Sequence, residues 1–428
     1  MKKLTYPRLR ETICCETLRN GLQILIAPRP GFSRKFAYFA TDYGSIDSTF
    51  QLGSQSVRTP DGVAHYLEHK MFDMPYGDAM EHFAAAGASP NAYTSYDLTA
   101  YFFECTEHFE ENLKTLLEFV STPYFTQASV QKEQGIIAQE IRMYEDNPGS
   151  RVFENLYAAM YHYHPLKTSI AGTVESIADI TPEILYSCHE AFYNPANMVL
   201  CVAGDLDPEL IIRTAEACVP DKISEVPVRN YGPDEPPYPV QAHIEQQMEV
   251  SMPMFAAGFK ADPPAHGEAI HIQELTAELA ADVLAGESSP LYQKLYEENL
   301  IDDSFSIGYD SIKNAGLLAA AGDCRDPEAV YSALLEESSR IAAEGIDEAL
   351  FQRLKKAAIG RQIRSLDSFS SVCARLAGGC FDGYAFQRFP ELYDQITAEQ
   401  VTEFLRQTVC PERGCLSVIL PVKETCAC

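Results

Sequence analysis

The residues best suited to chemistry are His65, Glu68 and His69, which form an H-x-x-E-H pattern. Apolar residues recur at helical spacing between Val63 and Phe72, so we expect this segment to be a helix. Residues four apart lie one above the other on a helix, and both imidazoles can therefore reach one metal ion. Glu68 lies on nearly the same face, where it is placed to act as a base beside the ion rather than as a ligand.

The pattern is specific enough to predict a metal site. With 10 histidines in 428 residues, a match would arise in about two of a hundred shuffled sequences of this composition. The alternative is an exposed helix that carries His and Glu by coincidence. Catalytic zinc binds three protein ligands and keeps an open position for water, whose pKa falls toward about 7. The site therefore needs a third ligand from elsewhere in the chain.

Two acids on a second predicted helix, residues 126–145, are the candidates for that ligand. Glu133 and Glu140 are seven residues apart and share one helix face. One of them can bind the metal while the other orients a histidine or the water. The spacing leaves the two roles open, and two solvated acids on an amphipathic helix are the alternative reading. Glu145 is a weaker competitor.

Strands and helices are expected around these residues. Apolar and β-branched runs predict strands at residues 22–27, 36–41 and 198–203. An alternating aromatic stretch predicts one strand over residues 91–104. Helical periodicity predicts helices near residues 77–86, 107–120, 126–145 and 182–192.

The second half of the chain repeats the order of elements found in the first. Residues 219–239 hold six prolines and predict a linker. An offset of 221 then matches residues 126–145 with 347–366, and Arg361 falls opposite Glu140. We therefore expect two similar α/β domains: an N-terminal metal-binding domain (1–218), a Pro-rich linker (219–245) and a metal-free C-terminal domain (246–428).

Four motifs resemble the pitrilysin/insulinase (inverzincin) family of zinc metallopeptidases. They are GVAHYLEHKMF, NAYTSYDLTAYF, EQGIIAQEI and HPLKTSIAG, in this order along the chain. The resemblance is closest to the bacterial YmfH-like members. In the first half of the chain the resemblance rests on these specific motifs. In the second half it rests only on size and on the order of elements.

The resemblance implies a fold and a set of roles. It implies two homologous domains, each a mixed, mostly antiparallel sheet packed with helices, that form half of a clam-shaped chamber. His65, His69 and Glu140 would bind one Zn²⁺ per chain, and Glu133 would support them. Glu68 would activate the water.

The resemblance also places a peptide substrate on the edge strand formed by Asn91, Ala92, Tyr93 and Thr94. An added strand gains affinity from main-chain hydrogen bonds, which suits a peptidase of low selectivity. Asn91 would hydrogen-bond the peptide near the cleaved bond. An ordinary edge strand is the alternative.

One departure from the family concerns residues in the second half. Family members often carry an Arg seven residues before a Tyr that grip the substrate. The matching positions are Tyr296 and Asp303, so that pair is absent here. We therefore expect a dimer, either a homodimer or a heterodimer with a related chain that lacks the zinc motif and supplies these groups.

Composition excludes several classes of protein. The formal net charge of −28 argues against nucleic-acid binding. No apolar run approaches the roughly 20 residues needed to span a membrane, and MKKLTYPRLRET does not resemble a signal peptide. The 13 cysteines form no disulfide framework and are expected to be scattered free thiols. Metal binding or thiol reactivity is the alternative for Cys14–Cys15 and for the terminal Cys426-Ala-Cys428. A reducing cytoplasm fits this pattern.

The leading function is therefore a zinc endopeptidase that hydrolyses short or unfolded peptides. A dedicated peptide-processing enzyme is a narrower form of it. The alternative is a non-catalytic or partner-dependent peptide-binding subunit of a heterodimeric peptidase. A scaffold would not need His65, Glu68, His69 and Glu140 together, and this favours the enzyme.

Overall fold

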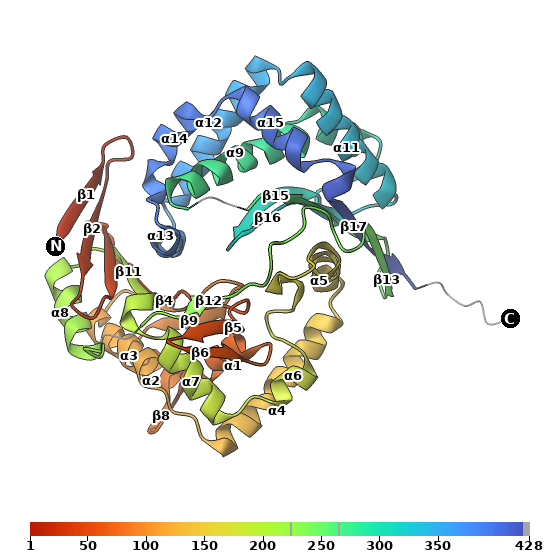
Figure 1. Cartoon of the computed structure of the whole chain (residues 1–428). Helices are drawn as coiled ribbons and strands as arrows, with labels where there is room; N and C mark the ends of the chain where they lie inside the picture. Colours follow the sequence, from red (N-terminus) through yellow and green to blue (C-terminus); the bar gives the residue numbers. More distant parts are fainter. Residues whose placement is uncertain (223–224, 264–265, 423–428) are drawn as a thin grey trace. The chain divides into compact units, whose positions relative to one another are not determined.

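The computed structural model describes residues 1–222, 225–263 and 266–422, so the terminal Cys426-Ala-Cys428 lies outside them (Figure 1). The described residues form two compact units, each assembled from both halves of the sequence. Unit 1 contains Met1–Ile141, Ser169–Tyr231 and Ile363–Arg388, and unit 2 contains Arg142–Thr168, Gly232–Gln362 and the described residues from Phe389 on. The division into 1–218, 219–245 and 246–428 stays a prediction.

Unit 1 is built on a seven-stranded sheet of order β1-β2-β3-β11-β4-β10-β9 (Figure 1). Strands β3 and β11 are parallel, and the other neighbours are antiparallel. The strands are β1 Lys2–Tyr6, β2 Glu11–Thr17, β3 Gln23–Pro28, β4 Lys35–Thr41, β9 Ser89–Thr94, β10 Thr99–Cys105 and β11 Met198–Gly204. Two small sheets are added: β12 Val228–Arg229 with β5 Thr49–Leu52 and β6 Gln55–Arg58, and β7 Asp73–Met74 with β8 Gly77–Asp78.

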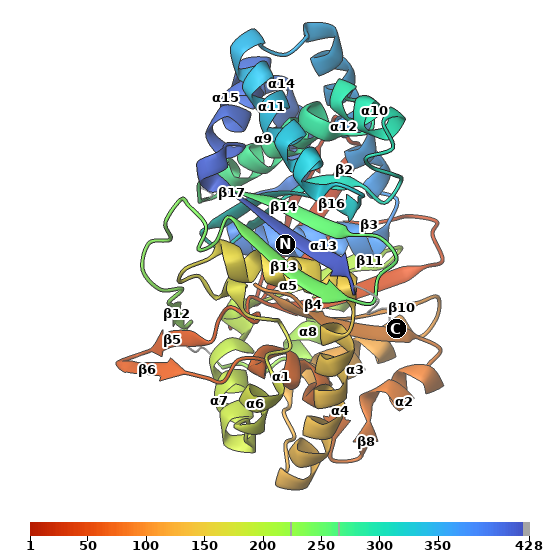
Figure 2. The same cartoon turned by 90° about the vertical axis from the view of Figure 1, so that its right-hand side faces the viewer.

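Helices cover both faces of this sheet. On one face, residues such as Phe39, Tyr101 and Leu200 share a buried core with α1, α3 and α7. Figure 2 shows these helices below β4 and β10. On the other face, α13 packs on β4 and β11 through Phe369 and Cys373. The helices of this unit are α1 Val63–Met71, α2 Ala79–Ala85, α3 Phe109–Ser121, α6 Val174–Ala178, α7 Pro182–Phe192, α8 Pro208–Cys218, α13 Phe369–Asp382, most of α4 Gln127–Glu145, and the 3₁₀ turns η2 Pro195–Asn197 and η3 Phe386–Arg388.

The single strand predicted over residues 91–104 is wrong, because this stretch forms the hairpin β9–β10. Ser95 N donates to Leu98 O at 2.8 Å, and Ser95 Oγ contacts Asp97 and Leu98. A side chain that bonds its own backbone two or three residues away closes a turn without glycine or proline. The turn makes β9 the last strand at one edge of the sheet.

Unit 2 is built on a five-stranded sheet of order β13-β17-β14-β16-β15. Its strands are β13 His243–Met248, β14 Met254–Ala261, β15 Ser306–Ile312, β16 Ala315–Asp323 and β17 Gly414–Pro421. Its helices are α5 Pro148–Met160, α9 Glu268–Ala285, α10 Pro290–Glu297, α11 Pro327–Glu344, α14 Phe389–Gln395, α15 Ala398–Thr408, most of α12 Glu348–Ser365, and the 3₁₀ turns η1 Pro165–Lys167 and η4 Pro411–Arg413.

The repeat that the sequence predicts is confirmed by strand order. In unit 2, β13 is parallel to β17 and the remaining neighbours are antiparallel, as for β3, β11, β4, β10 and β9 of unit 1. Helices α4 and α12 begin at matching positions, Gln127 and Glu348, at the offset of 221. The mixed α/β fold with two similar sheets is therefore as expected.

The helices that follow α4 and α12 along the chain each belong to the opposite unit. Helix α5 follows α4 and packs on β14 and β17 of unit 2 (Figure 1). Helix α13 follows α12 and packs on β4 and β11 of unit 1. Each sheet is therefore covered by a helix that belongs to the opposite half of the sequence.

Candidate active site

Helix α1 begins at a glycine that fixes its position. Gly62 has φ of 91°, and a Cβ at this residue would lie 2.4 Å from Ala171 O. Only glycine combines this conformation with so close a contact. Tyr66 and Leu67 of α1 are fully buried, so the helix is locked into the core and presents His65 and His69 toward α4.

The structure brings together the three ligands that the sequence predicts. His65 Nε2 lies 3.7 Å from Glu140 Oε1, and His69 Nε2 lies 3.4 Å from Glu140 Oε2. One ligand atom of each residue lies within 4.8 Å of the other two. Tetrahedral zinc with bonds of about 2.1 Å separates its ligands by about 3.4 Å, so the three side chains fit the ion.

Glu133 lies beside His69, where the predicted supporting acid would be. Its Oε1 lies 3.2 Å from His69 Nδ1, on the side of the ring away from Glu140. This hydrogen bond, with help from the Lys70 ammonium, holds the pKa of the Glu133 carboxyl below its usual range. Burial opposes protonation of His69, but Glu133, Glu68 and Glu140 outweigh it and raise the pKa of that imidazole. The arrangement fixes the His69 ring with Nε2 directed at the ligand cluster.

Glu68 is buried beside the cluster and is 8% exposed. Burial raises the pKa of its carboxyl, against the opposing influence of His65 and His69. Thr94 of the edge strand donates to Glu68 Oε2 at 3.0 Å, and Thr99 in turn donates to Thr94 at 3.4 Å. A carboxyl whose pKa lies above its usual range is a better proton acceptor and donor near neutral pH.

The predicted substrate residues of β9 divide between its two faces, because side chains alternate along a strand. Thr94 faces α1 through Glu68. Tyr93 faces the other way, and its hydroxyl lies 2.6 Å from that of Tyr38. Asn91 Oδ1 accepts a hydrogen bond from Ala92 N at 2.8 Å, so this side chain must move if a peptide is to take that donor.

One residue of the site was missed by the sequence analysis. Lys70 is only 1% exposed, and its ammonium pairs with Asp73 and lies 3.8 Å from Glu133 Oε2. A signal was available in the sequence, since Lys70 lies beside the apolar Met71 on a predicted helix rich in apolar residues. A buried lysine requires an acidic partner.

Comparison with known proteins identifies the family. Residues 49–174 match the family described as "Insulinase (Peptidase family M16)", and residues 179–358 match "Peptidase M16 inactive domain". "Uncharacterized zinc protease YmfH" of Bacillus subtilis is 36% identical over 430 residues, which cover 98% of this chain and 99% of that protein. The chain belongs to the M16 peptidase family.

Other M16 proteins resemble it in structure or in part. The crystal structure of a putative M16-like peptidase from Alicyclobacillus acidocaldarius has a TM-score of 0.92 at 36% identity, covering 96% of this chain and 99% of that one. "Probable mitochondrial-processing peptidase subunit beta" of Schizosaccharomyces pombe is 28% identical over 206 residues, which cover 47% of this chain and 43% of that protein. The pitrilysin/insulinase resemblance expected from the motifs is therefore confirmed.

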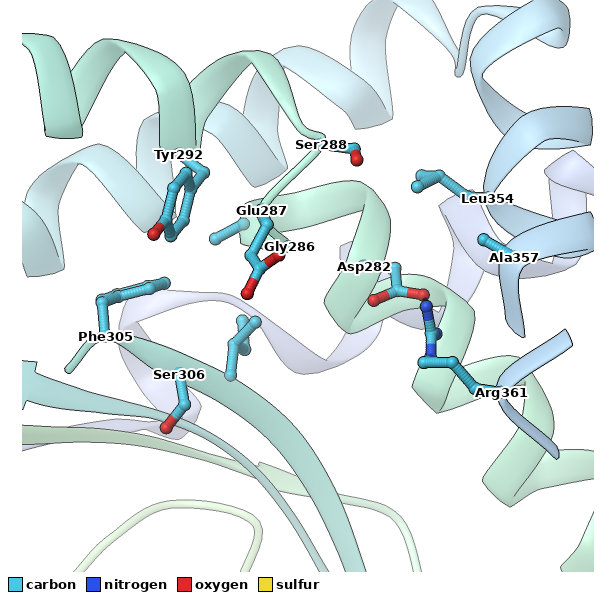
Figure 3. Close-up of a pocket in the computed structure, with 12 residues that line it drawn as sticks. Asp282, Gly286, Glu287, Ser288, Tyr292, Phe305, Ser306, Leu354, Ala357 and Arg361 are labelled. Atoms are coloured by element: carbon cyan, nitrogen blue, oxygen red, sulfur yellow. Dashed lines mark hydrogen bonds and ion pairs between the residues drawn. The ribbon is translucent and has the colours of Figure 1, made fainter. Parts of the chain in front are cut away.

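In this M16 protein, unit 2 holds an ion pair where unit 1 holds the ligand cluster. Along the chain, helix α9 comes after β14 and before the β15–β16 hairpin, just as α1 comes after β4 and before the β9–β10 hairpin. Its residues Glu278 and Asp282 are four apart, and Arg361 of α12 pairs with both. Figure 3 shows the side chains of Asp282 and Arg361 directed at one another beside a cavity of about 320 Å³.

None of the helices in the described ranges is both long and apolar enough to cross a membrane. The predicted cytoplasmic location of this M16 protein stays a prediction.

Proposed function

We propose that this chain is a zinc-dependent endopeptidase of the M16 family that hydrolyses short or unfolded peptides, with a dedicated peptide-processing role as the narrower form. The observation that carries the proposal is the contact of Glu140 with both imidazoles of the H-x-x-E-H helix, at 3.7 and 3.4 Å. The name of the 36% identical relative, a zinc protease, supports it.

His65, His69 and Glu140 would hold the zinc, one ion per chain. A bound zinc supplies Lewis acidity that polarises a peptide carbonyl and lowers the pKa of water. Glu133 would orient His69 through its bond to Nδ1, and would thereby keep Nε2 available to the ion.

Glu68 would move the proton. Its carboxylate accepts a proton from the attacking water and passes it to the leaving amine. The burial that raises its pKa makes the carboxylate a stronger base for the first step, and the hydrogen bond from Thr94 favours the charged form that this step needs. Buried and beside the ligands, Glu68 is positioned for both steps without binding the ion.

The peptide would bind as an added strand along β9, the edge of the seven-stranded sheet. Thr94 joins this edge to Glu68, so a peptide paired with β9 would bring its backbone close to the base. Asn91, Ala92 and Tyr93 would contact the peptide on the same strand. On binding, the Asn91 side chain would leave Ala92 N and hydrogen-bond the peptide instead.

A partner chain is the second part of the proposal. The family's substrate-gripping Arg and Tyr correspond to Tyr296 and Asp303, so the chain lacks them. A heterodimer with a related chain without the zinc motif would supply these groups. A homodimer, the other assembly, would bring only a second copy that lacks them. One relative carries the name of a peptidase subunit. A chain that only binds peptides for such a partner is the alternative function.

The purified chain tests the proposal directly. We expect about one zinc per chain by elemental analysis and cleavage of an unstructured peptide library that a chelator abolishes and added zinc restores. Glu140→Gln should weaken zinc binding by at least about 100-fold, because it removes a carboxylate ligand rather than a supporting group. Stoichiometric zinc without cleavage, even after co-purification with a partner, would favour the peptide-binding subunit. A wild-type chain that binds no zinc would refute the enzyme.

A further inference from the structure

Besides the contacts of His65 and His69 with Glu133 and Glu140, helices α1 and α4 make two contacts that lie one turn apart on α1. Tyr66 of α1 donates from its hydroxyl to the backbone carbonyl of Val130 on α4. Lys70, four residues later on α1, lies 3.8 Å from Glu133 Oε2. Both α1 side chains are essentially buried, at 0% and 1% exposure.

The contact of Lys70 with Glu133 involves a side chain that also contacts His69, whereas the contact of Tyr66 involves only the α4 backbone. Glu133 has its two oxygens engaged differently: Oε1 lies 3.2 Å from His69 Nδ1, while Oε2 faces the Lys70 ammonium. Lys70 is itself held by Asp73, which is 42% exposed at the start of β7. The chain of contacts thus runs from Asp73 through Lys70 and Glu133 to His69.

We infer that Lys70 is a positioning residue for the metal site, which it serves by holding Glu133 in the rotamer that orients His69. The inference rests on the zinc-peptidase function proposed above. Without the ammonium, one oxygen of a largely buried carboxylate loses its cationic partner, and the side chain gains freedom to turn toward solvent. His69 would then lose the partner that fixes its ring, and the ligand set would loosen.

The inference is tested by zinc affinity and by the absorption spectrum of the cobalt-substituted protein, which reports ligand geometry without requiring activity. Lys70→Met should weaken zinc binding by about 10- to 100-fold and alter the cobalt spectrum, as loss of a supporting contact does at other metal sites. Asp73→Asn, at a partly exposed position, should weaken zinc binding by about threefold to tenfold through the same chain of contacts.

Tyr66→Phe is the matched control, because it removes a contact of α1 with the α4 backbone without removing the cation beside Glu133. Its zinc affinity should stay within about twofold of wild type. An equal loss of zinc affinity in Lys70→Met and Tyr66→Phe would mean that Lys70 acts only through the packing of α1 on α4, and would overturn the inference. Zinc affinity at the wild-type level in Lys70→Met would also overturn the inference. If Lys70→Met does not fold, wild-type zinc affinity in Asp73→Asn would overturn it instead. A wild-type chain without zinc would overturn this inference together with the proposed function.

Discussion

In unit 1, α1 presents His65 and His69 to Glu140 of α4, and in unit 2, α9 presents Glu278 and Asp282 to Arg361 of α12. Both sites use a pair of side chains four residues apart and one side chain from the long helix. In unit 2 the positive charge is part of the chain, and the carboxylates are satisfied by it. In unit 1 the two imidazoles and the carboxylate are all of types that bind zinc, as the proposed metal site requires.

Further contacts complete the site in unit 2. Tyr393 donates to Glu278 Oε2 at 2.7 Å, and Gln362 donates to the same oxygen at 3.0 Å. Burial raises the pKa of Asp282, against the opposing influence of Arg361, while the acids beside Arg361 raise the pKa of the guanidinium. The same helical framework thus supports a closed ion pair in one unit and an open ligand set in the other. Chemistry is therefore expected from unit 1 alone.

The largest effect that separates the two sites is expected from Glu68→Gln. The variant keeps the proposed ligands but cannot accept a proton, so peptide hydrolysis should fall by about 10²- to 10⁴-fold. Zinc content, measured in the same preparation, should not change. Glu278→Gln in unit 2 is the matched substitution and should leave the rate at that of wild type. Near-normal turnover by Glu68→Gln would show that Glu68 takes no part in the reaction, and the proposed chemical difference between the two units would then fail.

A smaller effect is expected when the ion pair of unit 2 is broken. Arg361 is 47% exposed at its side chain, so Arg361→Gln should lower the free energy of unfolding by only about 0.5–1 kcal/mol. Zinc affinity should stay unchanged. Burial holds the pKa of Asp282 above its usual value, so the charged form is the one that needs Arg361. The part of the deficit that comes from Asp282 should therefore be full at neutral pH and disappear once that carboxyl is protonated, while the part from Glu278 remains.

Denaturant unfolding of wild type and Arg361→Gln at neutral and acidic pH measures that difference. Reduced zinc content in the variant would show that the two sites are not independent.

The smallest effect concerns the hydroxyl beside the base. Thr94 donates to Glu68 and so lowers the pKa that burial raises. Thr94→Val should move the acidic limb of the kcat/KM profile to higher pH and reduce the rate on that limb by about threefold, since less of Glu68 is then charged. Thr94→Ser keeps the hydroxyl and should retain the wild-type profile. An unchanged limb in the valine variant would mean that this bond is not formed in the working enzyme.

The ligand set could be predicted from sequence because each part of it is local. His65 and His69 share a face by helical periodicity, and so do Glu133 and Glu140. Which of the two acids lies against both imidazoles depends on how α4 packs on α1. That is set by packing around Tyr66 and by contacts such as that of Lys70 with Glu133, which no spacing rule supplies.

Other features depended on information that local patterns do not contain. The β9–β10 turn was missed because Ser95 and Asp97 close it through side chains, without the glycine or proline that usually indicates a turn. The sequence of α13 is amphipathic, but its apolar face fits any sheet of the right shape. Its place on β4 and β11 of unit 1 follows only from the three-dimensional structure.

The exchange of α5 and α13 constrains how this protein can be divided. A fragment that ends at the proline-rich stretch would contain all seven strands of unit 1 yet lack α13, leaving the buried Tyr38, Val199 and Cys201 open to water. Such apolar exposure favours aggregation. We therefore expect neither half of the polypeptide to be soluble when expressed alone, and we expect the two halves to recover a native state only when they are produced together.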